Sequence, residues 1–286
     1  MSPVDVASYV EPARAAELMG DLWLAGSSCQ ANAGGSYDAV AASALKLASW
    51  DFAKTEARCG FGARTLFWLR EKALDCAVGC FESQHPDGAV VSLGCGLSTA
   101  EFRASPGRCA WYNVDEGCVH ALRRAIFRQA GRGVPVECPF LDPRWMDRIS
   151  CGQGQAVLFL ADGLFSRMEL GLVKAFVALL AVRFPGGRLY FDALAGAAGK
   201  AARLAGRIKG SRGVSTFFCV DRASSLKALS PRIAGVSSRL PDLGRSDVYS
   251  LGERVCRELA GRVGLVQSFS LDFAGLRHGK AGAGRN

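Results

Sequence analysis

Short apolar runs alternate with longer helical patterns through the middle of the chain. Five runs have the length and composition of buried strands, at residues 89–93, 110–114, 134–138, 156–160 and 188–191. Helical patterns lie between them, at residues 116–129, 143–149 and 169–184. Strands that alternate with helices predict an α/β fold, in which a mostly parallel sheet is covered by helices on both faces.

The segment before the first strand has a helical pattern. Helices are predicted at residues 12–19, 38–47 and 67–83. A polar, glycine-containing break at residues 26–36 separates the first two. This segment is expected to pack on the sheet domain as a cap.

The segment after the fifth strand has weaker patterns. They predict helices at residues 193–208 and 248–263 and strands at residues 216–220, 233–237 and 266–273. The expected organisation is a helical cap (1–85), an α/β ligand-binding domain (86–275) and a flexible basic tail (276–286).

The composition is that of a folded domain. Of the 286 residues, 49% are hydrophobic and 21% are charged, which allows a substantial core and excludes a disordered protein. The net charge is +9. Because the basic residues are spread along the whole chain without a dense run, a generally basic surface is favoured over a nucleic-acid or membrane site.

The cysteine pattern and the length of the apolar segments predict where in the cell the protein is located. The 11 cysteines are scattered and no pair has Cys-x-x-Cys spacing, so no metal site is expected. Cys76 and Cys80 fit one face of a helix as small buried residues. The first residues lack a signal core, and no apolar stretch reaches the roughly 18 residues that span a bilayer. We expect a cytoplasmic protein with reduced thiols and no membrane partner.

A glycine turn follows the first predicted strand. Residues 89–93 lead directly into Gly94-Cys95-Gly96. Ligands of open α/β folds bind at the carboxyl ends of strands, where glycines let a ligand approach the backbone. No third glycine completes a dinucleotide fingerprint, and no Gly-Lys-Ser/Thr completes a phosphate loop. On its own the turn is either structural or part of a ligand site.

Each of the next three strands leads to an aspartate. Asp115 is suited either to binding ribose hydroxyls or to capping the helix that follows. Asp142, before Pro143, is suited either to meeting an exocyclic amine of a base or to capping. Asp162 precedes Gly163 in the fourth loop. Three acids at one edge of a sheet are harder to explain by capping alone.

The acids indicate the chemistry of the ligand. Carboxylates without a phosphate cradle suit a ligand that has hydroxyls and amines but no pyrophosphate. S-adenosylmethionine has a ribose, an adenine, an α-amino group and a sulfonium. Its own carboxylate requires a cation, most naturally an arginine.

Several stretches in the same order resemble the leucine carboxyl methyltransferase superfamily, and in particular its bacterial branch of tetracenomycin polyketide-synthesis (TcmP-like) O-methyltransferases. Together they cover about residues 50 to 192. The matching stretches are WDFAK at 50–54, LR at 69–70 with Asp75, HPDGAVVSLGCGL at 85–97, WYNVD at 111–115, LDPRWMD at 141–147, LFLADGL at 158–164 and RFPGG at 183–187.

The resemblance implies a fold and a cofactor site. The fold would be the class I, Rossmann-like methyltransferase fold, with a seven-stranded sheet whose last strand is antiparallel and with an N-terminal helical cap. Residues 86–275 would then bind S-adenosylmethionine. Arg70 would hold the methionine carboxylate, Gly94 and Gly96 would lie under the methionine moiety, and Asp115 would bind the ribose hydroxyls.

The resemblance also implies residues for the base and the reaction centre. Leu141 and Asp142 would contact the adenine. Asp162 stands where the family has glutamate, near the amino group of the cofactor and the reacting atoms, and is the catalytic candidate. Lys54 would line the same mouth.

The chain departs from the family pattern at several positions. Ser98-Thr99-Ala100 replaces Asp-Thr-Arg, and Asn113 replaces an acid. Glu116-Gly117-Cys118 replaces Leu-Pro-Glu. The tyrosine expected after the glutamate position is absent from Phe165-Ser166-Arg167. These departures place the change on the substrate side.

The expected reaction is an in-line displacement in which a hydroxyl or carboxylate oxygen of a small molecule, such as a polyketide-like or aromatic metabolite, takes the methyl group. A carboxylate needs no base. For a phenol the candidate bases are Asp162, His85, His120 and His278, although a surface or packing role is favoured for each histidine. Two alternatives stay open. The altered motifs suit a non-catalytic cofactor-binding module, and the net charge suits a nucleic-acid methyltransferase, although no Asn/Asp-Pro-Pro-Tyr motif follows the fourth strand.

Overall fold

The centre of the molecule is a seven-stranded sheet with the order β5-β4-β3-β6-β7-β9-β8. The computed structural model describes residues 3–27, 38–59, 63–104, 107–128, 131–152, 154–196, 218–239 and 266–275. The strands of the sheet are β3 (Ala89–Leu93), β4 (Ala110–Asp115), β5 (Val134–Glu137), β6 (Val157–Ala161), β7 (Arg188–Leu194), β8 (Ile233–Arg239) and β9 (Val266–Phe273).

One strand of the sheet runs against the others. β5, β4, β3, β6 and β7 pair in parallel, whereas β9 pairs antiparallel with both β7 and β8. β9 is the last strand among the described residues, so the predicted sheet with its antiparallel last strand is confirmed. The chain runs from β3 to β4 on one side and later adds β6 on the other. This reversal of direction at β3 is where open α/β sheets bind ligands.

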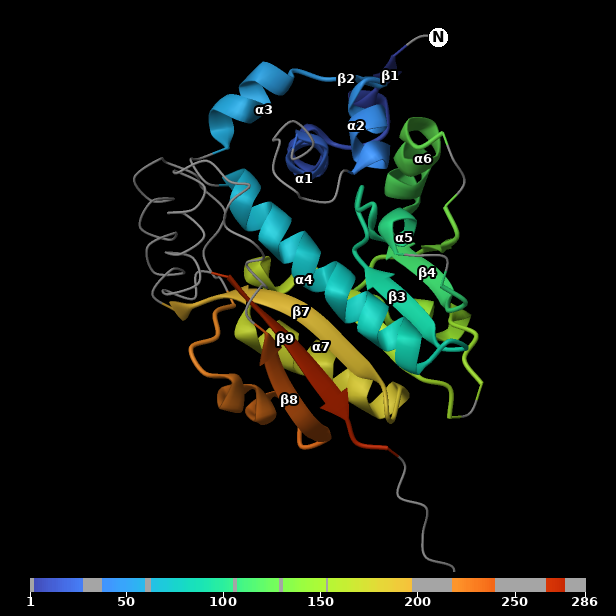
Figure 1. The fold of residues 1–286 in the computed structure, drawn as a ribbon, viewed down its shortest axis with the longest axis vertical. Helices are drawn as coiled ribbons and strands as arrows, with labels where there is room; N and C mark the ends of the chain where they lie inside the picture. Colours follow the sequence, from blue (N-terminus) through green and yellow to red (C-terminus); the bar gives the residue numbers. More distant parts are fainter. Residues whose placement is uncertain are drawn as a thin grey trace, which may run out of the picture.

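Alternation along β3 separates two layers of core. Ala89, Val91 and Leu93 belong to one apolar cluster, while Val90 belongs to another. The first cluster is completed by α7 (Leu170–Arg183) and by the 3-10 helices η3 (Pro143–Arg148), η4 (Phe165–Arg167) and η5 (Ala223–Leu229). The second is completed by α4 (Ala63–Gln84), which lies along the opposite face (Figure 1). Both faces of the sheet are therefore covered, as the alternating pattern predicts.

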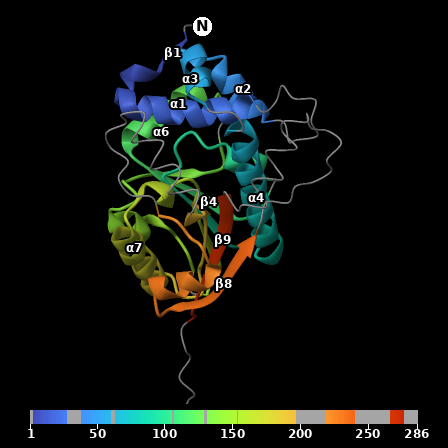
Figure 2. The same cartoon turned by 90° about the vertical axis from the view of Figure 1, so that its left-hand side faces the viewer.

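The N-terminal helices form a third layer beyond the ends of the strands. They are η1 (Val6–Ser8), α1 (Pro12–Ser27), α2 (Ala39–Leu45) and α3 (Phe52–Arg58), with a short parallel pair formed by β1 (Val4–Asp5) and β2 (Ala48–Ser49). Figure 2 shows α1 lying across one end of the molecule, together with α2, α3 and α6, and residues of α1 line the same cavity as the carboxyl end of β3.

A separate apolar cluster attaches this layer to the sheet domain. Leu18 and Leu22 of α1 are buried together with Val119 and Leu122 of α6 (Gly117–Ile126). The short helix α5 (Ala100–Arg103) follows the glycine turn. Because α1 is anchored by buried leucines, its other faces hold a fixed position relative to the strand ends.

Several predicted boundaries are wrong. α1 continues through Gly26 to Ser27, so the predicted break does not begin at residue 26. Ala193 and Leu194 belong to β7 rather than to a helix, because they continue its ladder with β9. The predicted helix at 143–149 is the 3-10 helix η3. In the described part of 216–220, Cys219 forms an isolated bridge with Leu194 rather than a strand.

Several predicted segments lie wholly or partly outside the described residues. They are the helix at 248–263, the tail at 276–286 and residues 197–208 of the helix predicted at 193–208. Among the described residues, no helix combines the length and the apolar composition needed to cross a membrane.

Candidate active site

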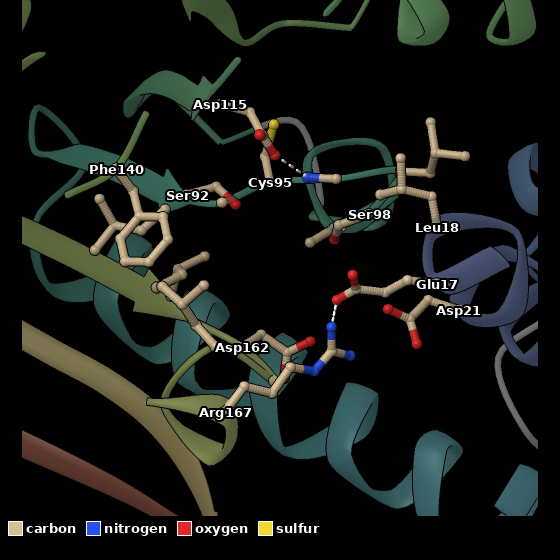
Figure 3. Close-up of a pocket in the computed structure, with 18 of the residues that line it drawn as sticks. Glu17, Leu18, Asp21, Ser92, Cys95, Ser98, Asp115, Phe140, Asp162 and Arg167 are labelled. Atoms are coloured by element: carbon tan, nitrogen blue, oxygen red, sulfur yellow. Dashed lines mark hydrogen bonds and ion pairs between the residues drawn. The ribbon is translucent and has the colours of Figure 1, made fainter. Parts of the chain in front are cut away.

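A cavity of about 610 Å³ lies at the carboxyl ends of β3, β4 and β6 (Figure 3). This volume is in the range of sites for small molecules and cofactors. Its walls come from the glycine turn, the ends of β4 and β6, the loop at 139–141, and one side each of α1 and α4. Arg70, Gly94, Gly96, Asp115, Leu141 and Asp162 all line it. Six of the seven residues predicted to bind the cofactor are therefore brought together.

The glycine turn has a backbone that other residues rarely adopt. Gly94 and Gly96 have φ values of 55° and 49°. A Cβ at Gly94 would lie 3.0 Å from Leu164 Cδ1, and a Cβ at Gly96 would lie 3.0 Å from Leu18 Cδ2. Both conformation and space therefore require glycine at these positions.

Asp115 is bonded to that turn. Its Oδ2 accepts a hydrogen bond from the Gly96 N–H at 2.8 Å, and its Oδ1 accepts one from the Glu116 N–H at 2.8 Å. The residue at the N-cap of α6 is Glu116, and no side-chain bond is made there. The interpretation of Asp115 as the helix cap is therefore wrong, and its carboxylate is fixed at the cavity wall instead.

Asp142 is placed differently. It caps η3 by accepting the Arg144 N–H at 3.0 Å, and its carboxylate is also paired with the Arg144 side chain. The hydrogen bonds from Arg144 lower the pKa of Asp142 to about 2. It is not among the residues that line the cavity, whereas Phe140 and Leu141 of the same loop are. The capping interpretation describes this residue, and its contact with the adenine stays a prediction.

Arg70 and Asp162 face each other across the cavity wall. Arg70 Nε of α4 lies 3.0 Å from Asp162 Oδ1, which follows β6. The guanidinium lies over the Phe67 ring, 4.8 Å from its centroid, and a Cβ at Gly163 would be 3.6 Å from Arg70 Nη1. Burial alone would lower the pKa of Arg70, but the nearby carboxylates of Asp162 and Asp192 outweigh it and raise the pKa. Arg70 is therefore a permanent cation held at a defined place.

Asp192 supports this pair from β7 and was missed by the sequence analysis. It is buried, and its Oδ1 accepts a hydrogen bond from the Gly163 N–H. Burial raises the pKa of Asp192 to about 6, and Arg70 counteracts part of that rise. The predicted fifth strand ended at residue 191, so the rule that located the other acids at strand ends would also have located this one.

Arg123 of α6 holds the glycine turn from behind. Its Nη1 donates to the backbone oxygens of Gly96 and Ser98 at 2.9 Å each, and its Nη2 is paired with Glu101. Asn113 Nδ2 donates to Glu101 Oε1 at 2.9 Å. Asn113, one of the departures from the family pattern, is thus part of the support of the turn. No sequence signal marked Arg123.

A second arginine, the partly buried Arg103, fixes α4 to the same region. Arg103 pairs with Glu71, with Asp75 at 2.9 Å and with Asp38 at 3.1 Å. Burial raises the pKa of Glu71 to about 8, although Arg103 opposes the rise. Thr99 also donates to Asp38 at 2.5 Å, so the residue after the departure at Ser98 ties the turn to the N-terminal layer.

One face of α1 forms a wall that the sequence analysis did not predict. Its lining residues follow helical spacing: Arg14, Glu17, Leu18, Asp21 and Ala25. Arg14 pairs with Glu17 at 3.1 Å and reaches Asp115 at 3.5 Å. Glu17 also pairs with Arg167, another departure from the family pattern (Figure 3). In the sequence these charges resemble an ordinary solvent face.

The remaining candidates lie elsewhere. Lys54 is exposed on α3, and it is not among the residues that line the cavity. His85 is exposed after α4, and His120 is buried on α6, where burial lowers its pKa. His278 is outside the described residues. Within the described ranges no cluster of three or more His, Cys, Asp or Glu could hold a metal ion.

The sheet order, the antiparallel β9 and the cavity at the strand ends define a class I methyltransferase fold. A protein from Thermobifida fusca YX described as a methyltransferase has a TM-score of 0.56 and 16% identity, over 90% of this chain and 94% of its own. A DUF574 family protein from Streptomyces avermitilis MA-4680 has a TM-score of 0.53 and 13% identity, over 88% and 96%. These likenesses confirm the predicted fold.

Sequence comparison points to a particular relative. The tetracenomycin polyketide synthesis O-methyltransferase TcmP of Streptomyces glaucescens is 25% identical over 158 residues, which are 55% of this chain and 57% of TcmP. No protein-family model matches the chain. The predicted resemblance to TcmP-like enzymes is confirmed, and the matched region spans less than two thirds of the length of TcmP.

Proposed function

We propose that the protein is an S-adenosylmethionine-dependent O-methyltransferase that acts on a hydroxyl or carboxylate oxygen of a small molecule. The observation that carries the proposal is the convergence in one cavity of a glycine turn, an acid bonded to that turn and a partly buried arginine, Arg70. The relationship to TcmP supports an aromatic or polyketide-like acceptor.

The residues present fit the cofactor. Arg70 pairs with Asp162 through Nε. Its two terminal nitrogens are therefore the groups suited to binding the methionine carboxylate of the cofactor. Asp115 is held by two backbone N–H groups, with its carboxylate at the cavity wall for the ribose hydroxyls. Phe140 and Leu141 offer the apolar surface that an adenine ring requires.

The chain acts mainly by positioning. The bound cofactor supplies a methyl group that is already activated on a sulfonium sulfur. The rigid turn at Gly94 and Gly96, supported by Arg123, fixes the floor of the site, and α1 covers it. Such a site needs to hold the acceptor oxygen in line with the methyl group, and Asp162 is the candidate for accepting a proton from a hydroxyl.

Calorimetric titration with S-adenosylmethionine and with S-adenosylhomocysteine tests the proposal. We expect both compounds to bind the wild-type chain, and Arg70→Ala to weaken both by at least about tenfold because it removes the partner of a carboxylate. Arg108→Ala is the matched control, because Arg108 is exposed and paired with Asp87 away from the cavity.

Transfer of a labelled methyl group to phenols and carboxylic acids then identifies the acceptor atom. Failure of the wild-type chain to bind either cofactor form would overturn the proposal. If Arg70→Ala and Arg108→Ala bind both compounds equally strongly, Arg70 does not contact the cofactor.

A further inference from the structure

Asp21 differs from every other charged residue on the cavity wall of α1. Arg14 and Glu17 are paired with each other and reach Asp115 and Arg167. Within the described part of the chain, Asp21 makes no hydrogen bond and no ion pair, although it lines the same cavity. Figure 3 shows its side chain on the cavity side of α1 beside Glu17. A carboxylate in this position is available to a ligand.

The surroundings of Asp21 define the kind of ligand. Asp21 is exposed toward the open cavity, and the protein that surrounds the cavity raises the pKa of its carboxyl group. Among the surrounding charges, Arg70 acts most strongly on this carboxylate and favours its ionised form, whereas Asp162 disfavours it. Asp21, Arg70 and Asp162 line the same cavity, and α1 contacts α4, the helix that carries Arg70.

The balance of charge at this end is negative. Four carboxylates, those of Asp162, Asp192, Asp21 and Glu71, act on the guanidinium of Arg70, and Glu71 is itself paired with Arg103. Asp162 is matched by its ion pair with Arg70, and Asp192 is bonded to the Gly163 N–H. Asp21 has no such partner, so a ligand that brings a cation next to a carboxylate would complete the arrangement. An α-amino acid group has this pair of charges.

We propose that Asp21 binds the α-ammonium group of the amino-acid moiety of S-adenosylmethionine, while Arg70 binds the neighbouring carboxylate. The two residues come from helices that approach the cavity from different layers, α1 and α4. Together they form a clamp for a zwitterion. This inference rests on the proposed function, and it makes the N-terminal layer part of the cofactor site.

The test compares ligands with and without the amino-acid moiety. Wild-type chain, Asp21→Asn and the control Glu11→Gln are titrated with S-adenosylmethionine, S-adenosylhomocysteine and 5′-methylthioadenosine, the last of which lacks the moiety. Glu11 is an exposed acid just before α1. We expect Asp21→Asn to weaken the first two compounds by about 10- to 100-fold, the loss of one charged hydrogen bond. Binding of 5′-methylthioadenosine is expected to stay unchanged, and Glu11→Gln is expected to behave as wild type.

Each other outcome has a defined meaning. Equal weakening of all three compounds would overturn the inference, because the adenosine part would then depend on Asp21. Unchanged binding of all three compounds by Asp21→Asn would overturn it as well. Weakening of the sulfonium compound alone would show that Asp21 senses the sulfur charge instead. If the wild-type chain binds neither cofactor form, the proposed function itself fails.

Two further variants keep the test valid if the first is unstable. Asp21→Ser removes the charge with a smaller side chain, and Asp21→Glu retains the carboxylate and is expected to recover part of the affinity. Circular dichroism of each variant shows whether the fold is retained. An Asp21→Glu protein that binds as weakly as Asp21→Ser, with its fold intact, would count against the clamp.

Discussion

Asp115 accepts a hydrogen bond from the backbone N–H of Gly96 at 2.8 Å, although the two residues are 19 positions apart in the chain. The glycine turn after β3 and the acid after β4 are therefore one structural unit. The oxygen that accepts this bond is Oδ2 of Asp115. Because the bond restrains the rotation of the carboxylate, its orientation toward the cavity is fixed before any ligand arrives. This arrangement is pre-organised for hydroxyl recognition.

Asp115→Asn is expected to weaken cofactor binding by about 10- to 100-fold, because one charged acceptor for the ribose hydroxyls is lost. Calorimetric titration with S-adenosylhomocysteine measures the effect. Asp142→Asn is the matched control, because Asp142 is paired with Arg144 outside the cavity lining. If both variants weaken binding equally, Asp142 belongs to the site after all.

Gly94→Ala is expected to destabilise the protein by ~1–2 kcal/mol, because alanine is strained at a φ of 55° and its Cβ would press on Leu164. Urea denaturation measures the free energy of unfolding. Gly20→Ala provides the contrast, since Gly20 is within α1 and a Cβ there meets nothing within 4 Å. That substitution should stabilise by about 0.5–1 kcal/mol. If Gly94→Ala and Gly20→Ala changed the free energy of unfolding equally, the positive φ of Gly94 would not require glycine.

Arg123→Ala is expected to cost about 3–5 kcal/mol, because it leaves Glu101 buried without its cation and frees the carbonyls of the glycine turn. Arg124, the next residue, pairs with Glu137 on the surface at 3.3 Å, and Arg124→Ala should cost less than about 1 kcal/mol. Chemical denaturation of both variants makes the comparison. A small effect of Arg123→Ala would show that the turn holds its shape without this support.

The stability of the protein should depend on pH through Asp192. Its pKa is about 6 in the folded chain, above the ordinary value of 3.8, because the group is buried. Between these values the folded chain holds a proton that the unfolded chain releases, so the contribution of this group to stability falls as pH rises from about 4 to about 6.

Asp192→Asn removes this titration and keeps an oxygen for the Gly163 N–H. As pH rises from about 4 to about 6, the free energy of unfolding of the variant should therefore increase relative to that of the wild type by ~1–3 kcal/mol. Denaturation curves at several pH values measure the difference. Asp87→Asn, at an exposed position, is the control and should show a constant difference. A constant difference for Asp192→Asn would mean that its carboxyl does not retain a proton.

The strands were predictable because each is a short apolar run between turn residues. β3 and β9 have the predicted bounds, β5 ends one residue earlier than predicted, and the other strands of the sheet are shifted or extended. The extension of β7 to Leu194 was not predictable from its own residues, because Ala193 and Leu194 suit a helix as well. Their strand conformation comes from pairing with β9, more than 70 residues later in the chain.

The site was predictable where a residue follows a strand. Asp115 and Asp162 were found in this way, and Arg70 came from the resemblance to a family. Asp21 and Arg123 were not found, because each reaches the cavity or the turn from a helix whose orientation the local sequence does not reveal. A charged helix face that lines a cavity has the same pattern as one that faces solvent.

α1 contributes to the wall of the cavity but not to the seven-stranded sheet. A chain shortened to begin at Ala39 would keep every strand of the seven-stranded sheet, yet it would lack the wall formed by Arg14, Glu17 and Asp21. It would also uncover the apolar residues of α6 that pack on Leu18 and Leu22. Changes in the first helix can thus alter what the protein binds while the rest of its architecture is inherited unchanged.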